Sequence, residues 1–295
     1  MRVNLGGIVP LSTLDWTGVA AAVIFMRGCP LRCPHCHNWQ LQSGESFEDL
    51  AEIKKKINGA RPFISAVILS GGEPLVQQRA ARKIAEHAKE AGLKVGIETS
   101  GRYPDRLAAL LDEGLVDMVF LDVKEVLRDP EYAAATGRKD VAPRVRESLD
   151  LCLGAGVPLE VRTTVFPNMP SLDRLLEIGK FLSELGIGSF TIQQGLPSDC
   201  EKPFDPVPIK LLTYISSTMK ERYGIDATIK KGPLSSQSRP YQTELFQICQ
   251  LRKPHPKMRR DPMKEDQTQD QDQNRDQDRG QDQTQNQNHK TGDES

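Results

Sequence analysis

Three thiols stand close together near the N-terminus of the chain. Cys29, Cys33 and Cys36 lie in the run GCPLRCPHCHN with the spacing C-x3-C-x2-C, directly after the apolar stretch 19–26. Thiolates are soft ligands that favour zinc or iron–sulfur clusters. A structural zinc site closes four protein ligands, whereas a cubane cluster on three cysteines leaves one iron open to a small molecule. The spacing therefore indicates an iron–sulfur cluster with one open coordination position.

Short apolar runs alternate with amphipathic segments through the first 250 residues. The runs predict buried strands, and the segments between them, several of which are followed by glycine, predict helices. Strands are expected at 19–26, 66–69, 94–98, 118–122, 159–165 and 190–193, and helices at 47–57, 77–91, 104–113, 144–155, 172–185 and 209–223. This alternation predicts an α/β fold with a parallel sheet, open or curled into part of a barrel.

Polar residues recur where the predicted strands end. In parallel α/β folds the loops at the carboxyl ends of the strands hold the chemistry, so these residues should meet at one edge of the sheet. In chain order they are the cysteine loop, the run SGGEP, the run ETSG, the pair Asp122 and Lys124, Arg162, and Gln193 with Gln194.

The run CPLRCPHC, followed after the next strand by SGGEP, resembles the radical S-adenosylmethionine (SAM) superfamily over roughly residues 1–250. That resemblance implies a partial (β/α)6 barrel. The opening LGGIVPLSTLDWTG and the runs CHN, ETSG and LDVK resemble the activating enzymes of glycyl-radical enzymes. Among those, the opening is most similar to the activating protein of anaerobic ribonucleotide reductase.

The resemblance implies a cofactor pair and a reaction. In the family, three cysteines bind a [4Fe-4S] cluster and the fourth iron chelates the amino and carboxylate groups of SAM, so Cys29, Cys33 and Cys36 are the expected ligands. Reductive cleavage then releases methionine and a 5'-deoxyadenosyl radical that abstracts hydrogen, from a glycine of a partner protein in the activating enzymes. The cofactor does the difficult chemistry and the protein positions it. A reductant such as flavodoxin or ferredoxin is implied.

The run Gly71, Gly72, Glu73 and Pro74 is expected to bind SAM. Its two glycines permit tight turns and close approach, so backbone oxygens and the Glu73 carboxylate are available to the SAM ammonium. The resemblance carries the same role. A bare GGEP run is otherwise a strand-to-helix turn.

Four further residues are matched to the family's SAM contacts. Glu98 is expected near the ribose or the amino group. Lys124, as a point charge, and Arg162, as a planar fork, are expected at the SAM carboxylate. Asp122 belongs to the same DxK segment or holds a monovalent cation found in some relatives. The alternative for each is an ordinary strand-end ion pair, worth little in water.

Two other functions remain open. One is a radical SAM enzyme acting on a small molecule, similar to a deazaguanine synthase. The other is a non-enzymatic zinc-binding interaction module, with His35 or His37 as the fourth ligand, which leaves GGEP, ETSG and LDVK unexplained.

We expect a single cluster, because no second cysteine-rich insertion is present. We expect His37 and Asn38 to cap a turn.

Composition separates a core of residues 1–250 from a segment 251–295. The segment begins with the basic run RKPHPKMRR and continues with Gln, Asp and Asn, so we expect a basic linker and a disordered acidic tail. Residues 261–295 carry a net charge of −6, against −1 for the chain.

No apolar run approaches the roughly 18 residues of a membrane span, and the start lacks the features of a secretion signal. The six cysteines are not spread in pairs. We therefore expect a soluble cytoplasmic protein with neither membrane nor nucleic acid as partner.

Overall fold

A computed structural model of the chain describes residues 1–196 and 204–231. All of them belong to one compact unit, Met1–Cys249. The expected domain boundary at residue 250, the basic linker, the acidic tail, Cys200 and Cys249 lie outside the described residues.

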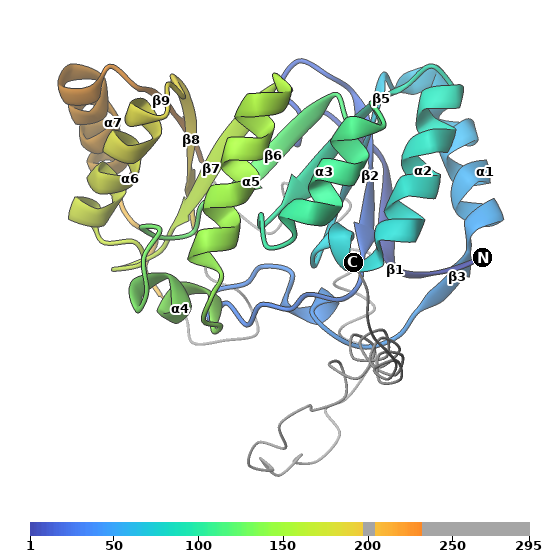
Figure 1. The fold of residues 1–295 in the computed structure, drawn as a ribbon, viewed down its shortest axis with the longest axis horizontal. Coiled ribbons are helices and arrows are strands. Elements are labelled where there is room, and N and C mark those ends of the chain that lie inside the picture. The colour runs from blue at the N-terminus through green and yellow to red at the C-terminus, as the bar shows by residue number, and fades with distance from the viewer. Residues whose placement is uncertain (197–203, 232–295) are drawn as a thin grey trace, which may run out of the picture. The chain divides into compact units, whose positions relative to one another are not determined.

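One sheet of nine strands organises the described part of the chain, in the order β3-β1-β2-β4-β5-β6-β7-β8-β9. Figure 1 shows it behind a layer of helices. From β2 onward every pairing is parallel, while β1 runs antiparallel to both β2 and β3. The strands are β1 Arg2–Ser12, β2 Ala21–Met26, β3 Phe47–Asp49, β4 Ala66–Gly71, β5 Lys94–Thr99, β6 Met118–Asp122, β7 Leu159–Val165, β8 Ser189–Gln194 and β9 Asp226–Lys230.

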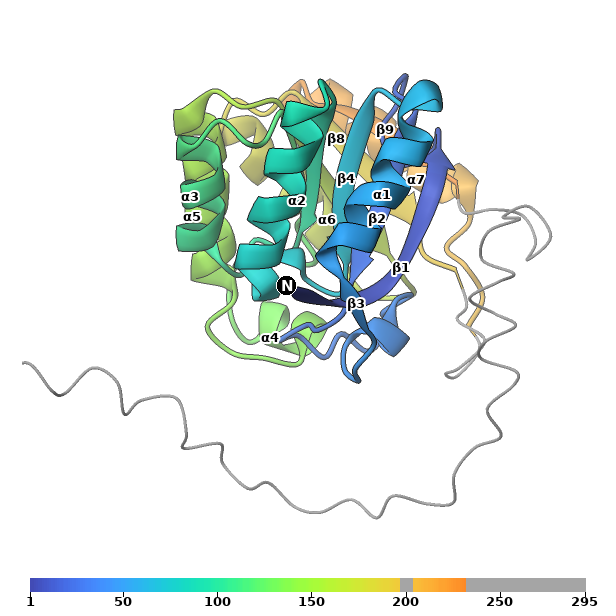
Figure 2. The ribbon, with the colours of Figure 1, turned by 90° about the vertical axis from the view of Figure 1, so that its right-hand side faces the viewer.

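Helices connect the parallel strands. They are α1 Leu50–Ala60, α2 Gln78–Glu90, α3 Pro104–Asp112, α4 Glu131–Thr136, α5 Ala142–Ala155, α6 Leu172–Glu184 and α7 Ile209–Tyr223. Short 3-10 turns lie at Trp39–Leu41, Arg61–Phe63 and Pro74–Gln77. In Figures 1 and 2 the short α4 lies at the lower edge of the sheet, beside the loop that follows β2.

The two faces of the sheet differ in chemistry because side chains alternate along each strand. On β7, Val161 and Val165 pack into the main core against the helices. Glu160, Arg162 and Thr164 therefore point to the opposite, inner face. A smaller apolar cluster covers the start of that face. The inner face is thus apolar near the beginning of the strands and polar toward their carboxyl ends, as a partial barrel with a binding site at that end requires.

The expected α/β fold with a parallel sheet is confirmed. All six predicted strands are present, as β2 and β4 to β8. Residues 47–49 form strand β3 and not the start of a helix, because the Asp49 side chain accepts a hydrogen bond from the Ala51 amide and α1 begins only at Leu50. In the described ranges, no helix has the length and apolarity to cross a bilayer.

Candidate functional site

The cysteine loop after β2 is closed by backbone hydrogen bonds. The Gly28 amide donates to the Leu41 carbonyl at 2.7 Å, and the Cys29 amide donates to the Gln42 carbonyl at 3.1 Å. The Arg32 amide donates to the Thr136 carbonyl at the end of α4, at 2.7 Å. These contacts fix both ends and the middle of the loop, so the three thiols are held at the carboxyl edge of the sheet.

Cys29, Cys33 and Cys36 are each half-buried and free of disulfides. Burial raises the pKa of Cys29 to about 12. Burial also raises the pKa of Cys33, and the neighbouring Cys36 adds to that rise. Binding to iron requires thiolates, so loading of this loop must release protons. Among the described residues, no three His, Cys, Asp or Glu side chains converge closely enough to hold a single metal ion. Three neighbouring thiols on one loop are nevertheless the donor set of a cubane cluster with one open iron.

Gly71 and Gly72 pass directly under the cysteine loop. Gly71 has φ +122°, and a Cβ there would lie 2.2 Å from the Met26 carbonyl oxygen. A Cβ on Gly72 would lie 2.4 Å from the Gly28 carbonyl oxygen. The Glu73 amide also donates to that Gly28 oxygen, at 2.8 Å. Glycine is therefore required at both positions, because the GGEP loop and the cysteine loop approach each other too closely for a side chain.

The Glu73 carboxylate faces the protein interior and is fully buried. It accepts hydrogen bonds from the Ser100 amide at 2.9 Å, the Ser100 hydroxyl at 2.6 Å and the Thr99 hydroxyl at 2.9 Å. The Leu75 amide donates to it at 3.2 Å, which makes Glu73 the cap of the Pro74–Gln77 turn. Burial raises the pKa of Glu73, and these donors oppose the rise. The carboxylate thus ties the GGEP loop to the end of β5, and the backbone of the run remains the part suited to a ligand.

The residues around the third cysteine contact neighbouring loops. The Asn38 amide nitrogen donates to the Gly71 carbonyl at 3.2 Å, and this side chain does not cap the turn that follows. His35 stacks on Phe166 with ring centroids 4.7 Å apart, and His37 meets the Leu196 carbonyl through Nε2 at 3.0 Å. The cysteine loop is therefore braced from three directions: by α4, by the GGEP loop and by the segments after β7 and β8.

Lys124 brings a positive charge to the cysteine loop. Its Nζ lies 3.0 Å from the Asp122 carboxylate. Burial lowers the pKa of Lys124, but Asp122, Cys33 and Tyr132 outweigh burial and raise it above its usual range. The Lys124 amide donates to the hydroxyl of the fully buried Tyr132 at 3.3 Å. Lys124 is therefore a fixed cation close to the thiols.

Arg162 is held tightly on the inner face. Its Nη1 donates to Glu98 at 2.8 Å, its Nε to Glu160 at 2.7 Å, and its Nη2 to the Asp15 carbonyl at 2.8 Å. Its guanidinium carbon lies 4.0 Å from the centre of the Phe120 ring. Three of its five N–H donors are used by the protein, so two remain for a ligand. Glu98 is likewise engaged, since it also accepts the Ser70 hydroxyl at 2.5 Å.

Arg162→Met should lower the free energy of unfolding by about 3 kcal/mol, because it leaves Glu98 and Glu160 without their buried cation. The measurement is equilibrium urea denaturation followed by circular dichroism. Arg82→Met is the matched control, since Arg82 donates to Glu113 at 2.6 Å from an exposed position, and exposed pairs contribute little. Equal effects of the two substitutions would contradict this view of the inner face.

All the residues predicted from strand ends lie at one edge of the sheet or on its inner face. The partners that restrain them were not predicted: Thr99 and Ser100 on Glu73, Glu160 on Arg162, Tyr132 under Lys124, and Phe166 on His35. Glu160 carried a usable signal, because it stands two residues before Arg162 on the same strand and must share its face. Tyr132 carried none, since α4 was not predicted.

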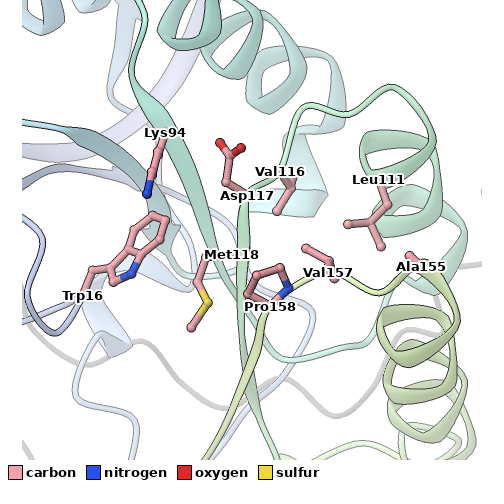
Figure 3. Close-up of a pocket in the computed structure, with 9 residues that line it drawn as sticks. All are labelled: Trp16, Lys94, Leu111, Val116, Asp117, Met118, Ala155, Val157 and Pro158. Carbon is pink, nitrogen blue, oxygen red and sulfur yellow. The ribbon is translucent and has the colours of Figure 1, made fainter.

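A hollow of about 550 Å³ lies at the other end of the strands. Trp16, Lys94, Met118 and Pro158 are among the residues that line it (Figure 3). Lys94 and Met118 begin β5 and β6, so this hollow opens at the edge opposite the cysteine loop. Trp16 packs edge-on against Phe120 with ring centroids 5.6 Å apart. The segment between β1 and β2 thus closes the floor of the inner face.

Residues 23–182 match the model of the radical SAM superfamily, and this match covers more than half of the chain. The chain belongs to the radical SAM superfamily. A candidate glycyl-radical enzyme activating enzyme of Methanocaldococcus jannaschii is 33% identical over 218 residues, which are 71% of this chain and 87% of that protein. The pyruvate formate-lyase-activating enzyme of Clostridium pasteurianum is 32% identical over 142 residues, 46% of this chain and 58% of that protein.

Solved structures show the same fold. A radical SAM methyltransferase from Sphaerobacter thermophilus aligns with a TM-score of 0.61 at 14% identity, over 75% of this chain and 68% of that one. SuiB of Streptococcus suis, bound to S-adenosylmethionine, aligns with a TM-score of 0.56 at 14% identity, over 72% of this chain. The match spans 50% of SuiB, so this radical SAM protein covers about half the length of that relative.

The protein is thus a radical SAM enzyme and a homologue of glycyl-radical enzyme activating enzymes. Membership in this superfamily excludes the hypothesis of a non-enzymatic zinc-binding module, which explained only the cysteines. The C-x3-C-x2-C loop of the family is present in full, at the edge of the sheet where its fold places the chemistry.

Proposed function

We propose that this enzyme cleaves SAM reductively at a [4Fe-4S] cluster bound by Cys29, Cys33 and Cys36, and that it takes a hydrogen atom from a glycine of a partner glycyl-radical enzyme. The observation that carries the proposal is the 33% identity over 71% of the chain to the M. jannaschii relative. When bound, the cluster supplies the electron that breaks a carbon–sulfur bond of SAM. The protein's own contribution is to bind and orient SAM.

Lys124 is the side chain best placed for the SAM carboxylate. It is a fixed cation that interacts with Cys33, beside which SAM must bind. Arg162 has two N–H donors left and is assigned a supporting part, with Glu98, on the inner face. Asp122 holds Lys124 in place, and a monovalent cation beside it stays part of the proposal.

The GGEP run is assigned to the SAM ammonium through its backbone. Gly71 and Gly72 bring that backbone against the cysteine loop, and Pro74 starts the turn that follows. Because the Glu73 carboxylate already has four protein donors, we assign it the part of fixing the run.

The partner we propose is anaerobic ribonucleotide reductase. Support comes from the opening LGGIVPLSTLDWTG, which forms most of β1 and the segment that reaches Arg162 and Phe120. The relatives named as activating enzymes of pyruvate formate-lyase make that lyase the competing partner. The expected compartment is the cytoplasm, where thiols stay reduced and flavodoxin- or ferredoxin-type carriers supply electrons.

The test is anaerobic reconstitution with iron and sulfide, reduction in the presence of SAM, and chromatographic assay for 5'-deoxyadenosine. Anaerobic ribonucleotide reductase and pyruvate formate-lyase are then added in separate samples, and electron paramagnetic resonance spectra are recorded. The proposal expects deoxyadenosine and a glycine-centred doublet with the reductase.

Each other outcome has a distinct meaning. A doublet only with the lyase would replace the proposed partner and keep the activase. Deoxyadenosine with neither doublet would favour a radical SAM enzyme acting on a small molecule, such as a deazaguanine synthase. Tight zinc binding without cleavage would overturn the proposal.

Deletion of the residues after Arg260 should leave iron content and SAM cleavage unchanged. The deleted residues are rich in Gln, Asp and Asn and include no branched apolar or aromatic residue. They therefore lack the side chains that build a hydrophobic core. The measurement is deoxyadenosine formation by the truncated and full-length proteins, reconstituted side by side. A truncated protein that binds iron but no longer cleaves SAM would show that the segment takes part in the reaction.

A further inference from the structure

A group of cationic side chains lies beside the cysteine loop without carboxylate partners. Among the described residues, none of this group forms an ion pair, whereas Arg82 and Arg146 on helices α2 and α5, and Arg128 in the segment before α4, all do. We call the group the cationic rim; its members are Arg32, Arg102, Arg106, Arg138 and Lys139. They come from the cysteine loop, from the loop before α3 and the first turn of α3 itself, and from the loop before α5.

The rim is continuous with the cysteine loop. Two guanidinium groups lie near the Tyr103 ring, that of Arg106 at 4.4 Å and that of Arg102 at 5.8 Å from its centre. Besides burial, the charge of Arg138 lowers the pKa of Arg102. Gly137, next to Arg138, packs so closely that a Cβ there would lie 2.7 Å from the Arg32 carbonyl oxygen.

No ion pair within the described residues balances the charge of the rim, although Asp140 acts on Arg102 from a longer distance. Burial lowers the pKa of Arg102, and Arg138 and Arg144 lower it further, while Asp140 opposes the change. The Arg102 Nε atom is buried and has no hydrogen-bond partner in the described part of the chain. Arg144 is left out of the rim because Glu147 pairs with it at 3.1 Å. The Arg32 guanidinium donates hydrogen bonds to the Cys29 and Leu31 carbonyls, so its positive charge also lies at the cysteine loop.

We propose that the cationic rim is the docking surface for a small acidic protein that carries single electrons to the cluster. The inference rests on the proposed function, because reductive cleavage uses one electron for each SAM molecule. The carrier gives up that electron and is oxidised, and no bond forms between the two proteins.

Location favours a carrier over other partners. Electron transfer slows steeply with distance, so a carrier must contact the segment that holds the cysteines. The inner face of the sheet is assigned to SAM and substrate. The rim instead lies on the loops that lead into α3 and α5 and on the first turn of α3, on the side of the helices. It includes Arg32 of the cysteine loop.

The composition of the rim also suits such a partner. Arginine and tyrosine are the residues most enriched at the energetic centres of interfaces. Unpaired positive charge attracts an acidic partner and raises its rate of association. Electron-transfer complexes are weak and need less than about 1,200 Å² of buried surface, and the rim with Tyr103 offers a compact surface of this kind.

The test uses charge reversal at two exposed members of the rim, R138E/K139E. The matched control is K55E/K56E on α1, which changes the net charge equally at two exposed cations that pair with Glu52 and Glu48. A bacterial flavodoxin is the probe, and its affinity for each cluster-loaded and cluster-free protein is measured by titration calorimetry at low and at physiological salt. We expect R138E/K139E to weaken binding on the order of tenfold, with the control close to the unmodified protein.

A second readout separates docking from folding. Deoxyadenosine formation is measured with flavodoxin hydroquinone and, separately, with titanium(III) citrate, which needs no docking surface. The proposal expects R138E/K139E to be slow with flavodoxin and unimpaired with titanium citrate. Equal loss with both reductants, or unchanged affinity for flavodoxin, would overturn it.

Two other results would point elsewhere. If R138E/K139E binds flavodoxin normally but fails to produce the glycyl radical, the rim docks the glycyl-radical enzyme and the carrier proposal is wrong. If the unmodified protein cleaves no SAM with titanium citrate, the proposed function fails on its own, while the calorimetry still tests the docking surface.

Discussion

Cys33→Ala is expected to abolish both the cluster and SAM cleavage. Cys33 is the middle of the three proposed ligands and interacts with Cys29, Cys36 and Lys124. With Cys33 replaced, the loop would offer two thiols in place of the three that would hold a cubane cluster with one open iron. The measurement is iron and acid-labile sulfide after anaerobic reconstitution, followed by the deoxyadenosine assay.

Cys152→Ala provides the matched control. Cys152 is also a buried free thiol, but it lies in α5 within the main core. Its replacement should cost about 1 kcal/mol in stability through the small cavity created, with iron content and SAM cleavage unchanged. If Cys33→Ala kept a full complement of iron, or Cys152→Ala lost it, the assignment of the cluster ligands would be wrong.

The parallel strands were predictable because burial on both faces makes them apolar runs. Residues 66–69 and 118–122, for example, read as strands from composition alone, and they form β4 and β6. Strand β1 escaped prediction because its sequence RVNLGGIVPLS contains two glycines and a proline. Its pairing with β2 shifts register between Leu5 and Gly7 and again between Val9 and Ser12, which breaks the alternation that sequence reading depends on.

The positions of the site residues followed from the strand ends, but their partners did not. Sequence places Arg162 on a strand, yet only the register Asp122↔Arg162 between β6 and β7 brings it beside the DxK segment. Its ion pair with Glu98 joins residues 64 positions apart. Contacts of this kind depend on three-dimensional register, and one sequence alone carries no signal for them.

The contacts of the Glu73 carboxylate could not be predicted from the sequence either. Its acidity and its place after β4 suggested a ligand for the SAM ammonium, and both observations remain correct. What the sequence lacked was the position of Ser100, whose amide and hydroxyl occupy the same carboxylate oxygen. The structure therefore shifts the proposed ligand contact of this run from the side chain to the backbone.

Gly72→Ala is expected to remove most of the cluster and of SAM cleavage while the protein stays folded. The three atoms nearest to a Cβ at residue 72 all belong to the backbone: the Gly28 carbonyl oxygen at 2.4 Å, the Gly28 carbonyl carbon at 2.9 Å and the Leu41 carbonyl oxygen at 3.0 Å. Contacts below 3.0 Å with backbone atoms force a shift, and here the atoms that must move directly precede Cys29. The expected readouts are reduced iron content and reduced deoxyadenosine formation, with far-ultraviolet circular dichroism unchanged.

Gly59→Ala is the control that makes the Gly72 result specific. Gly59 lies within α1, and a Cβ there would have no heavy atom within 4 Å. Alanine replaces glycine in a helix with a gain of up to about 1 kcal/mol, so this variant should be slightly more stable and fully active. If Gly72→Ala bound iron normally but lost SAM cleavage, the loop would have absorbed the added methyl group and the glycine would serve the approach of SAM. Loss of iron together with cleavage would instead show that the GGEP run shapes the cysteine loop before any ligand binds.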